Sequence, residues 1–521
     1  MKQKGILFFM AALVLVLCSC GKKAQAPSAD SKEIVEIIWQ YPSPGDLGPG
    51  FQEMEDALNA MMERDIGVHV RFEPVPLMES QQKAVLMVSS GEKLDIALTA
   101  FTSLGPVIES GLIIPLDDLV NQYGQDLIAH CGVLLEKCNY GGKLYGIPPA
   151  YVMGEAYGYM VRDDILKKHG ITVDETKLYT LADIEAMFEK VKTAEGPNFY
   201  CTIPWNTETA PLNNSYIAYD KVMGSFSGGV LMLNRSFTDL TITNLFETEE
   251  YKNYAQMMYR WAQKGYISPD AAVTSDFVDT LLQSGNYLGM MYWHQPKSTN
   301  SAIGTMGLDL TCMKLVDAYV QNEGGMPLMW NVASTSTNPA KAVQALNYIY
   351  QHKEAAWLMQ FGLEGKSYEV VEDGPDGKVI KYLAEDTSTL PYHTPYGLWG
   401  DRLEWPAVYP SSASFNRLLK EKDAAIPKSR YSPAIGYSFV QEPVTTEVAA
   451  VNTVIAQYAP GFNSGSLNPD TALPEFISAL KAAGIDKVIA ENQRQINEWV
   501  AAARENDTGI GMVSVELKVR Q

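Results

Sequence analysis

The segment from Ile34 to Leu98 constrains the fold most, because strand-forming runs and helical patterns alternate along it. Residues 34–39 (IVEIIW) are β-branched and apolar, and they predict a buried strand. The next apolar side chains share one face of a predicted helix, namely Met54, Leu58, Met61 and Met62. Strands are predicted again at 68–72 and 95–98, with a second helix at 80–89 between them. This alternation is typical of an α/β fold with a parallel sheet.

Two loops of this unit are expected at a ligand-binding edge. Right-handed crossovers place the loops 40–50 and 99–104 beyond the carboxyl ends of the strands, where open α/β sheets bind their ligands. Without its first residues the chain still has about 490 residues, well beyond the ~250–300 at which a single core stops growing. At least two domains are therefore expected.

The first twenty residues have the anatomy of an export signal. Lys2 and Lys4 precede an apolar run, Ile6 to Leu17, which is too short for the ~20 residues of a membrane-spanning helix. The end of the run, Leu17-Cys18-Ser19-Cys20, resembles the lipobox of bacterial lipoproteins. That resemblance implies removal of residues 1–19 as a signal peptide and lipidation, with palmitate, of Cys20. A plain signal peptide cut nearby, or a buried N-terminal helix, is the alternative.

Residues 20–32 are small and polar after the lipidated cysteine, and they predict a flexible tether. The globular body is then expected at the extracellular face of the cell membrane, held by the lipid alone. The net charge of −20 disfavours nucleic acid, whose phosphates need Lys and Arg. It equally disfavours an anionic ligand that is captured by long-range attraction.

Four cysteines remain beyond the lipid site: Cys131, Cys138, Cys201 and Cys312. They are expected to be free, mostly buried thiols, because a chain of this size does not need a disulfide for stability. A bridge between Cys131 and Cys138 is left open. Their spacing is not that of a zinc site.

The rest of the chain continues as a mixture of strands and helices. A strand at 160–162 leads into a helix, and further helices are predicted at 180–192 and 251–265. A strand at 326–333 is followed by one long helix, 340–361, which begins with proline in its first turn. The last predicted elements are a hairpin or surface excursion within 365–395 and two helices, 440–459 and 473–504.

Several short stretches, in this order along the chain, resemble extracellular solute-binding lipoproteins of bacterial ABC importers, in a long, LipO-like subgroup close to the carbohydrate binders. The matching stretches are Gly142–Pro148 (GKLYGIP), Val161–Leu166 (VRDDIL), Gly265–Ile267 (GYI), Trp330–Val332 (WNV), Gly362–Tyr368 (GLEGKSY) and Leu480–Asp486 (LKAAGID). The resemblance spans nearly the whole mature chain.

The resemblance implies a two-lobed α/β fold of the periplasmic-binding-protein type II, with the ligand in the cleft between the lobes. Lobe 1 is expected to comprise 33–152 and 333–400, and lobe 2 to comprise 153–332 and 401–521. Crossing segments are expected near 150–159, 327–333 and 396–410. Ligand contacts to both lobes would stabilise a closed state by a hinge motion.

Aromatic and polar side chains near the predicted loops and crossings are the candidate ligand-binding residues. Aromatic rings offer flat apolar faces to a sugar, and forked polar groups pair with its hydroxyls. The candidates are Trp39, Tyr41, Asp46, Phe101, Trp205, Asn206, Trp293, His294, Trp330, Asn331, Trp399, Asp401 and Arg402. Core packing is the alternative for each aromatic residue, and a solvated surface position is the alternative for Asp46 and Arg402. Trp330→Ala is expected to weaken ligand binding without unfolding the chain.

No catalytic or cofactor motif accompanies this pattern. The six histidines lack metal-ligand spacing, and there is no P-loop, G-x-S-x-G or G-x-G-x-x-G. We therefore predict a receptor without cofactor or metal, and not an enzyme. It is expected to act as a monomer, to capture an oligosaccharide or related carbohydrate and to deliver it to the permease subunits of an ABC transporter. A peptide receptor of the same fold and a surface-anchored glycan-degrading enzyme remain the alternatives.

Overall fold

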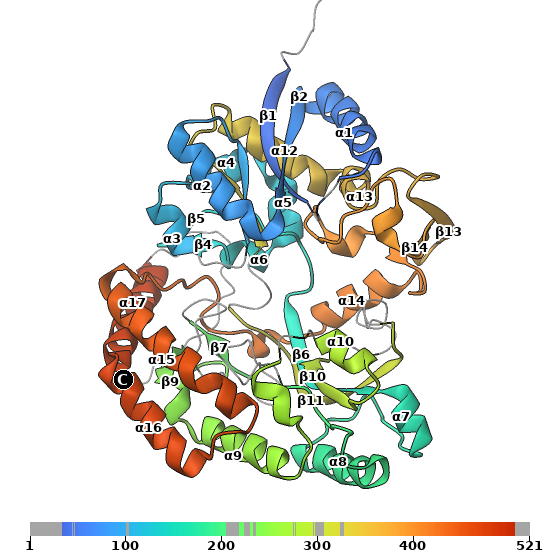
Figure 1. Ribbon diagram of the computed structural model, residues 1–521. Coiled ribbons are helices and arrows are strands. Elements are labelled where there is room, and N and C mark those ends of the chain that lie inside the picture. Colours follow the sequence, from blue (N-terminus) through green and yellow to red (C-terminus); the bar gives the residue numbers. More distant parts are fainter. Residues whose placement is uncertain are drawn as a thin grey trace, which may run out of the picture.

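The structure is a computed structural model that describes residues 34–505, except for 44, 46, 101–103, 205–217, 223–229, 233–235, 275, 277, 295, 297–306 and 323–327. Two lobes lie one above the other, joined by chain segments that cross between them (Figure 1). Among the described residues, no helix is both long and apolar enough to cross a membrane.

Lobe 1 is built on a four-stranded sheet in the order β12-β3-β1-β2. Three strands are parallel, namely β1 (Val35–Ser43), β2 (Val68–Pro76) and β3 (Ile96–Ala100). The fourth, β12 (Leu328–Val332), is antiparallel to β3. The helices α1 (Gly50–Ile66) and α2 (Ser80–Ser90) connect the parallel strands, so the predicted α/β unit is confirmed.

The remaining helices of lobe 1 are α3 (Leu104–Glu109), α4 (Asp117–Tyr123), α5 (Gln125–Cys131), α6 (Val133–Glu136), α12 (Pro339–Gln351) and α13 (Lys353–Phe361). A short hairpin, β4 (Asn139–Tyr140) with β5 (Lys143–Leu144), follows α6. β1 enters at the top of Figure 1 and runs down, so the carboxyl ends of the parallel strands point towards lobe 2. The predicted ligand-binding edge of the sheet therefore faces the space between the lobes.

Lobe 2 is centred on an antiparallel sheet in which β6 (Gly154–Arg162) lies between β10 (Gly289–Trp293) and β11 (Leu310–Val320). A second small sheet joins β7 (Asp220–Lys221), β8 (Val230–Met232) and β9 (Ile242–Asn244). The helices of this lobe are α7 (Asp163–Lys168), α8 (Leu181–Glu195), α9 (Glu249–Gln263), α10 (Val278–Gln283), α15 (Thr445–Asn463), α16 (Pro469–Ala482) and α17 (Ile485–Glu505).

Each lobe has its own apolar core. One buried cluster draws its members from 37–150 and 329–399, and another from 157–319 and 434–496. Two independent cores in a chain of this length agree with the expectation of at least two domains. The strand β12 packs in the first core, although 153–332 was expected in lobe 2. Its pairing with β3 moves that boundary to a position before Leu328.

Two predicted helices are each interrupted. The helix expected over 340–361 breaks at His352, whose backbone is extended (φ −118°, ψ 88°) and separates α12 from α13. Neither glycine nor proline marks this break in the sequence. The helix expected over 473–504 breaks at Gly484, which adopts a positive φ of 97° between α16 and α17. The hairpin expected within 365–395 is confirmed as β13 (Tyr368–Gly374) with β14 (Gly377–Tyr382), and β14 also pairs with β15 (Ala407–Val408).

Candidate ligand site between the lobes

Hydrogen bonds tie the crossing segments to one another at the junction of the lobes. The first crossing leaves lobe 1 at Ala150 and enters β6 at Gly154. The Ala150 N–H donates to the Gly400 carbonyl at 3.0 Å, and the Arg402 N–H donates to the Ala150 carbonyl at 2.9 Å. The parts of the chain near 150 and 400 are therefore held side by side where the lobes meet.

Asp423 provides a second link at the junction. It lies on α14 (Phe415–Ala424), and its Oδ1 accepts hydrogen bonds from the N–H groups of Met153 and Gly154, at 2.9 and 2.8 Å. Burial raises the pKa of this carboxyl group, and the two backbone N–H groups act in the opposite direction. A carboxylate that accepts backbone hydrogen bonds holds the start of β6 against α14.

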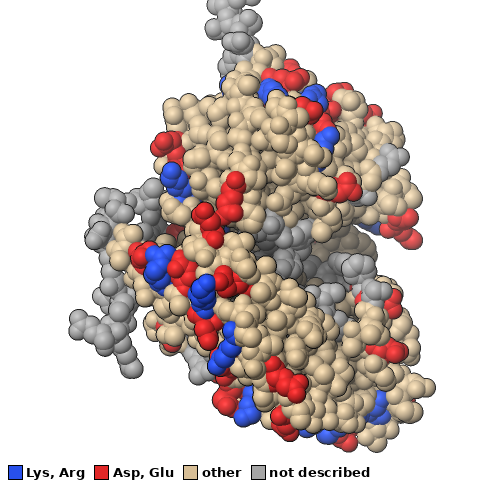
Figure 2. Space-filling model, turned by 60° about the vertical axis from the view of Figure 1, so that its left-hand side comes forward, with Lys and Arg blue, Asp and Glu red and all other residues tan. Residues whose placement is uncertain are grey.

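The junction is also where the surface is hollowed. In Figure 2 a notch separates the two lobes at the right of the view. Residues of both lobes also contact each other directly, since the Ser438 hydroxyl donates to the Asn139 carbonyl and Gly436 packs against Glu136. Burial raises the pKa of Glu136 to about 7.

Arg402 lies beside two aromatic rings at this junction, and all three side chains are partly buried. The guanidinium carbon of Arg402 lies 3.9 Å from the ring centre of Tyr151 and 5.8 Å from that of Trp405. The indole of Trp405 is fixed by a hydrogen bond to the Trp399 carbonyl at 3.1 Å. Aromatic faces beside a planar donor group are suited to a sugar ring and its hydroxyls. Burial lowers the pKa of Arg402.

Four of the predicted aromatic ligand contacts lie instead in the core of lobe 1: Trp39, Tyr41, Trp330 and Trp399, each at most 1 % exposed. The Trp330 and Trp399 rings stack at 5.0 Å, and Trp39 meets the Trp330 ring edge-on at 5.4 Å. β1 extends to Ser43, so Trp39 lies in the middle of the strand and not at its end. In this conformation these side chains have no surface to offer a ligand.

The predicted polar residues near these tryptophans also have structural partners. Asn331 is fully buried, and its Nδ2 donates to the Tyr145 carbonyl at 2.7 Å. Asp401 accepts hydrogen bonds from the Leu403 N–H at 2.8 Å and contacts His130 Nδ1 at 2.9 Å. Both side chains hold loops of lobe 1 near the junction.

Trp293 and His294 end the strand β10 in lobe 2. Trp293 is 40 % exposed and remains a candidate for ligand contact. His294 is buried, and burial together with the nearby Lys422 and Lys314 ammonium groups lowers its pKa to about 4. It is therefore neutral at physiological pH. Five predicted residues lie outside the described residues: Cys20, Asp46, Phe101, Trp205 and Asn206.

Two residues of the junction were not among the sequence-based candidates: Tyr151 and Trp405. Both fall within the crossing segments that were predicted, near 150–159 and 396–410. An aromatic residue in a crossing segment was the signal that could have identified them. Arg402 was predicted, and the structure brings it together with both.

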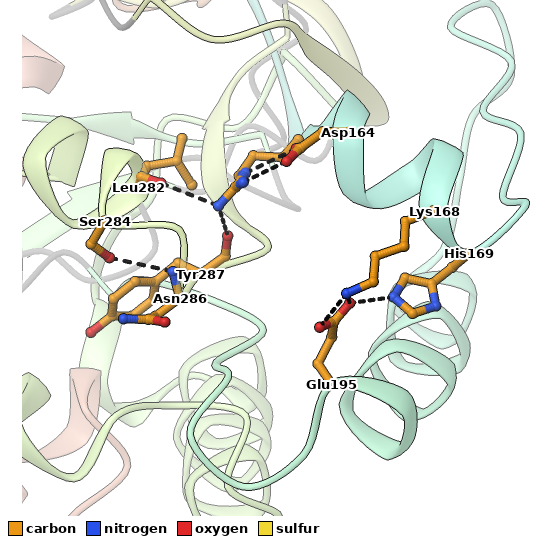
Figure 3. Close-up of polar contacts among 9 residues, drawn as sticks. Asp164, Lys168, His169, Glu195, Leu282, Ser284, Asn286 and Tyr287 are labelled. Carbon is orange, nitrogen blue, oxygen red and sulfur yellow. Dashed lines mark hydrogen bonds and ion pairs between the residues drawn. The ribbon is translucent and has the colours of Figure 1, made fainter.

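A polar cluster elsewhere in lobe 2 has a structural role (Figure 3). Glu195 at the end of α8 pairs with Lys168 and with His169 Nε2, each at 2.6 Å, and so fixes the end of α7. Lys168, and then His169, lower the pKa of Glu195. In the same lobe Arg162 Nη2 donates to the Asp164 carboxylate at 2.6 Å.

The buried thiols and the acidic residues do not suggest redox or metal chemistry. Cys131, Cys138, Cys201 and Cys312 are free and buried, as predicted, so Cys131 and Cys138 are not bridged. Burial raises the pKa of Cys138 and of Cys201 to about 12, which makes these thiols unreactive. Among the described residues, no group of His, Cys, Asp and Glu side chains is arranged to hold a metal ion.

Comparison with known proteins decides the family. The family described as bacterial extracellular solute-binding protein matches residues 56–366, more than half of the chain. The chain belongs to this family. A domain of unknown function (DUF3502) matches residues 433–501, which cover α15, α16 and most of α17. The prediction of a two-lobed solute-binding protein, and not an enzyme, is confirmed by this membership.

Relatives of the family match nearly the whole chain. A carbohydrate ABC transporter substrate-binding protein of Streptococcus pneumoniae is 23% identical over 500 residues, which cover 94% of this chain and 96% of that protein. The crystal structure of the N-glycan transport solute binding protein NgtS of the same species has a TM-score of 0.74 and 21% identity, over 91% of this chain and 100% of that chain.

A third relative has the same architecture. It is the HMO-binding, ABC-transporter-associated solute binding protein of Bifidobacterium longum infantis, with a TM-score of 0.60 and 15% identity, over 89% of this chain and 99% of that chain. NgtS has also been crystallised with Man5GlcNAc, and that structure has a TM-score of 0.66 and 20% identity, over 92% of this chain and 100% of that chain. At these identities the likeness concerns the fold, which confirms the predicted α/β type II class.

Proposed function

We propose that this solute-binding protein captures a carbohydrate, in the form of an oligosaccharide, between its lobes and delivers it to the permease subunits of an ABC transporter. The observation that carries the proposal is the junction of Tyr151, Arg402 and Trp405, where aromatic faces and a free donor group meet on the crossing segments. Sugar rings need both kinds of contact. Two relatives that span nearly the whole chain are a carbohydrate substrate-binding protein and an N-glycan transport protein, which supports the same ligand class.

The proposed mechanism is closure of the lobes about the crossing segments. The Ala150–Arg402 and Gly154–Asp423 hydrogen bonds would hold the crossing segments together during the motion. The two lobes, each with its own core, would then move as separate bodies. A ligand that contacts both lobes stabilises the closed state by the difference of its affinities for the two states. The permease would then recognise the closed form.

The proposed location is the extracellular face of the bacterial cell membrane. Cys20 would carry the lipid, and residues 20–32 would connect it to the first strand of lobe 1 at Val35. This part of the proposal rests on the sequence Leu17-Cys18-Ser19-Cys20 and on the extracellular family. Mass spectrometry of the protein from a bacterial membrane tests it: a diacylglycerol-modified Cys20 at the N-terminus is expected, and an unmodified cysteine would contradict it.

A thermal-shift screen tests the ligand class. The chain without its first twenty-one residues is incubated with oligosaccharides, monosaccharides and short peptides. A ligand at ~100 times its dissociation constant should add roughly 2.7 kcal/mol to the free energy of unfolding. A shift with oligosaccharides, and the sugar recovered unchanged, is the expected result. A shift with peptides alone, or turnover of the sugar, would contradict the proposal.

A further inference from the structure

The guanidinium group of Arg402 differs from that of every other arginine whose side chain is described, because it makes no hydrogen bond or ion pair. The others each have a carboxylate or carbonyl acceptor, namely Arg64, Arg71, Arg162, Arg260, Arg417, Arg430 and Arg494. Arg402 is also half-buried, whereas a free arginine normally extends into water. A half-buried guanidinium group without a hydrogen-bond acceptor is unusual and calls for an explanation.

The backbone of lobe 1 and two rings remove water from one side of this guanidinium. Its Nε is buried and has no hydrogen-bond partner. A Cβ added to Gly397 would lie 2.8 Å from this Nε, so the glycine backbone packs directly against it. The Tyr151 and Trp405 rings lie beside the group at 3.9 and 5.8 Å. Attraction between a cation and a ring face compensates only part of the lost hydration.

The carboxylates of the junction do not pair with this guanidinium, and each has a partner of its own. Asp401 contacts His130 and accepts from the Leu403 N–H. Glu404 pairs with Lys420. Asp423 accepts from two backbone N–H groups of the first crossing. Arg402 therefore has no carboxylate partner among the residues that the structure describes.

Of the three guanidinium nitrogens of Arg402, only Nε is both buried and without a hydrogen-bond partner. The two terminal nitrogens are not among such atoms. When a guanidinium group lies against ring faces, its N–H donors point outward in its own plane, and they form a fork that matches two oxygens of one carboxylate. A carboxylate would satisfy the hydrogen bonds and the charge together. Neutral hydroxyl groups would satisfy the hydrogen bonds and leave the charge uncompensated.

From this arrangement we infer that the solute carries a carboxylate, as in a uronic or sialic acid residue of a glycan, and that Arg402 pairs with it in two parallel hydrogen bonds. The inference rests on the proposed carbohydrate-binding function and names the substrate class within it. The net charge of −20 gives no long-range attraction to such a solute. Selection of the acid is therefore a short-range property of the junction.

The test compares acidic oligosaccharides with related neutral sugars that lack the free carboxylate, by isothermal titration calorimetry on the purified protein. The probes are trigalacturonate against its methyl ester, a glucuronate-substituted xylo-oligosaccharide against the unsubstituted one, and 3′-sialyllactose against lactose. At least one acid should bind ten times more tightly than its neutral partner. Added salt should weaken the binding of the acid more than that of the neutral sugar.

Three variants assign the preference to Arg402. Arg402→Gln should abolish the difference between acid and neutral partner, and Arg402→Lys should retain part of it. Gly397→Ala should reduce the preference without changing the arginine, because the added methyl group displaces the guanidinium. Arg260→Gln is the matched control: this arginine pairs with Glu185 far from the junction, and its loss should change neither affinity. Thermal melting of each variant confirms that it is folded.

The outcomes separate this inference from the proposed function. Equal or tighter binding of the neutral partners would overturn the inference and leave a carbohydrate receptor. A preference for the acid that survives in Arg402→Gln would also overturn it. Binding of none of the six sugars would count against both.

Discussion

At the scale of the residue, Arg402 and Arg162 have opposite roles although both are removed from water. Arg162 is 8 % exposed and donates to Asp164 and to the carbonyls of Leu282 and Tyr287. A buried charge with these partners stabilises the fold, and removing it leaves the partners unsatisfied. Arg402 has no such partners to lose.

Arg402→Gln should therefore change the free energy of unfolding of the ligand-free protein by less than about 1 kcal/mol, because lost cation–ring attraction offsets relieved desolvation. Arg162→Gln should cost about 3 kcal/mol or more. Chemical denaturation of both variants without ligand makes the comparison. A large loss for Arg402→Gln would mean that this arginine has a structural partner after all.

Trp330 belongs to the core, so the earlier expectation for its substitution is revised. Its ring is fully buried between Trp39 and Trp399, and its Nε1 donates to the Leu398 carbonyl at 2.9 Å. Trp330→Ala should cost about 3–5 kcal/mol of stability, since it opens a large cavity. Circular dichroism melting measures the cost. A variant with unchanged melting and weaker ligand binding would restore Trp330 as a ligand contact.

At the scale of the element, the first α/β unit and most of the longer helices could be predicted from the sequence, whereas β10 and β11, which flank β6 in lobe 2, were not. The periodicity of apolar residues predicted β1, β2, β3 and the helices between them, and the helix predicted over 180–192 is α8. The break at His352 could not be predicted, because no residue there forbids a helix. Trp39 was expected at the end of its strand, but β1 continues to Ser43 through Tyr41-Pro42-Ser43, which were predicted to belong to a loop.

Gly158 shows how closely the strands of lobe 2 approach one another. It lies in the central strand β6, and a Cβ built there would stand 2.2 Å from the Met313 carbonyl oxygen in β11. Gly158→Ala should destabilise the protein by about 1–3 kcal/mol, because backbone atoms must move apart. Gly374→Ala is the control, since nothing lies within 4 Å of its added methyl group. Equal urea midpoints for the two variants would contradict this packing.

At the scale of the whole molecule, the lobes contact each other around Glu136 and Gly436. Burial raises the pKa of Glu136 to about 7, so the folded protein binds this proton more tightly than the unfolded chain does. Stability from this group is present below the unfolded pKa of about 4.5 and is lost as the pH rises towards 7. A carboxylate at this contact is therefore less favourable than a carboxylic acid.

Glu136→Gln should remove this contribution. Between pH 4.5 and pH 8, the wild-type free energy of unfolding should fall relative to the variant by about 1–2 kcal/mol, allowing for partial exposure of the side chain. Urea denaturation across the pH range measures the difference. If both proteins respond to pH in parallel, Glu136 ionises freely and does not contribute to the contact.

More of the molecule's architecture than of its ligand site could be predicted from the sequence. Two lobes and the crossings near 150 and 400 followed from chain length and from a family resemblance, and Arg402 was placed near the second of these. The crossing expected at 327–333 is instead the strand β12 of the lobe 1 sheet. The partners of Arg402 could not be predicted, because Tyr151 and Trp405 meet it only through the pairing of residues near 150 with residues near 400. Such contacts between distant segments have no local pattern in the sequence.

The central claim is that a captured oligosaccharide closes the two lobes. Small-angle X-ray scattering of the protein, with and without the oligosaccharide that gives the largest thermal shift, tests it most directly. We expect a smaller radius of gyration with the sugar bound, and unchanged sugar after the measurement. Scattering curves that coincide at saturating sugar would contradict closure about the crossing segments.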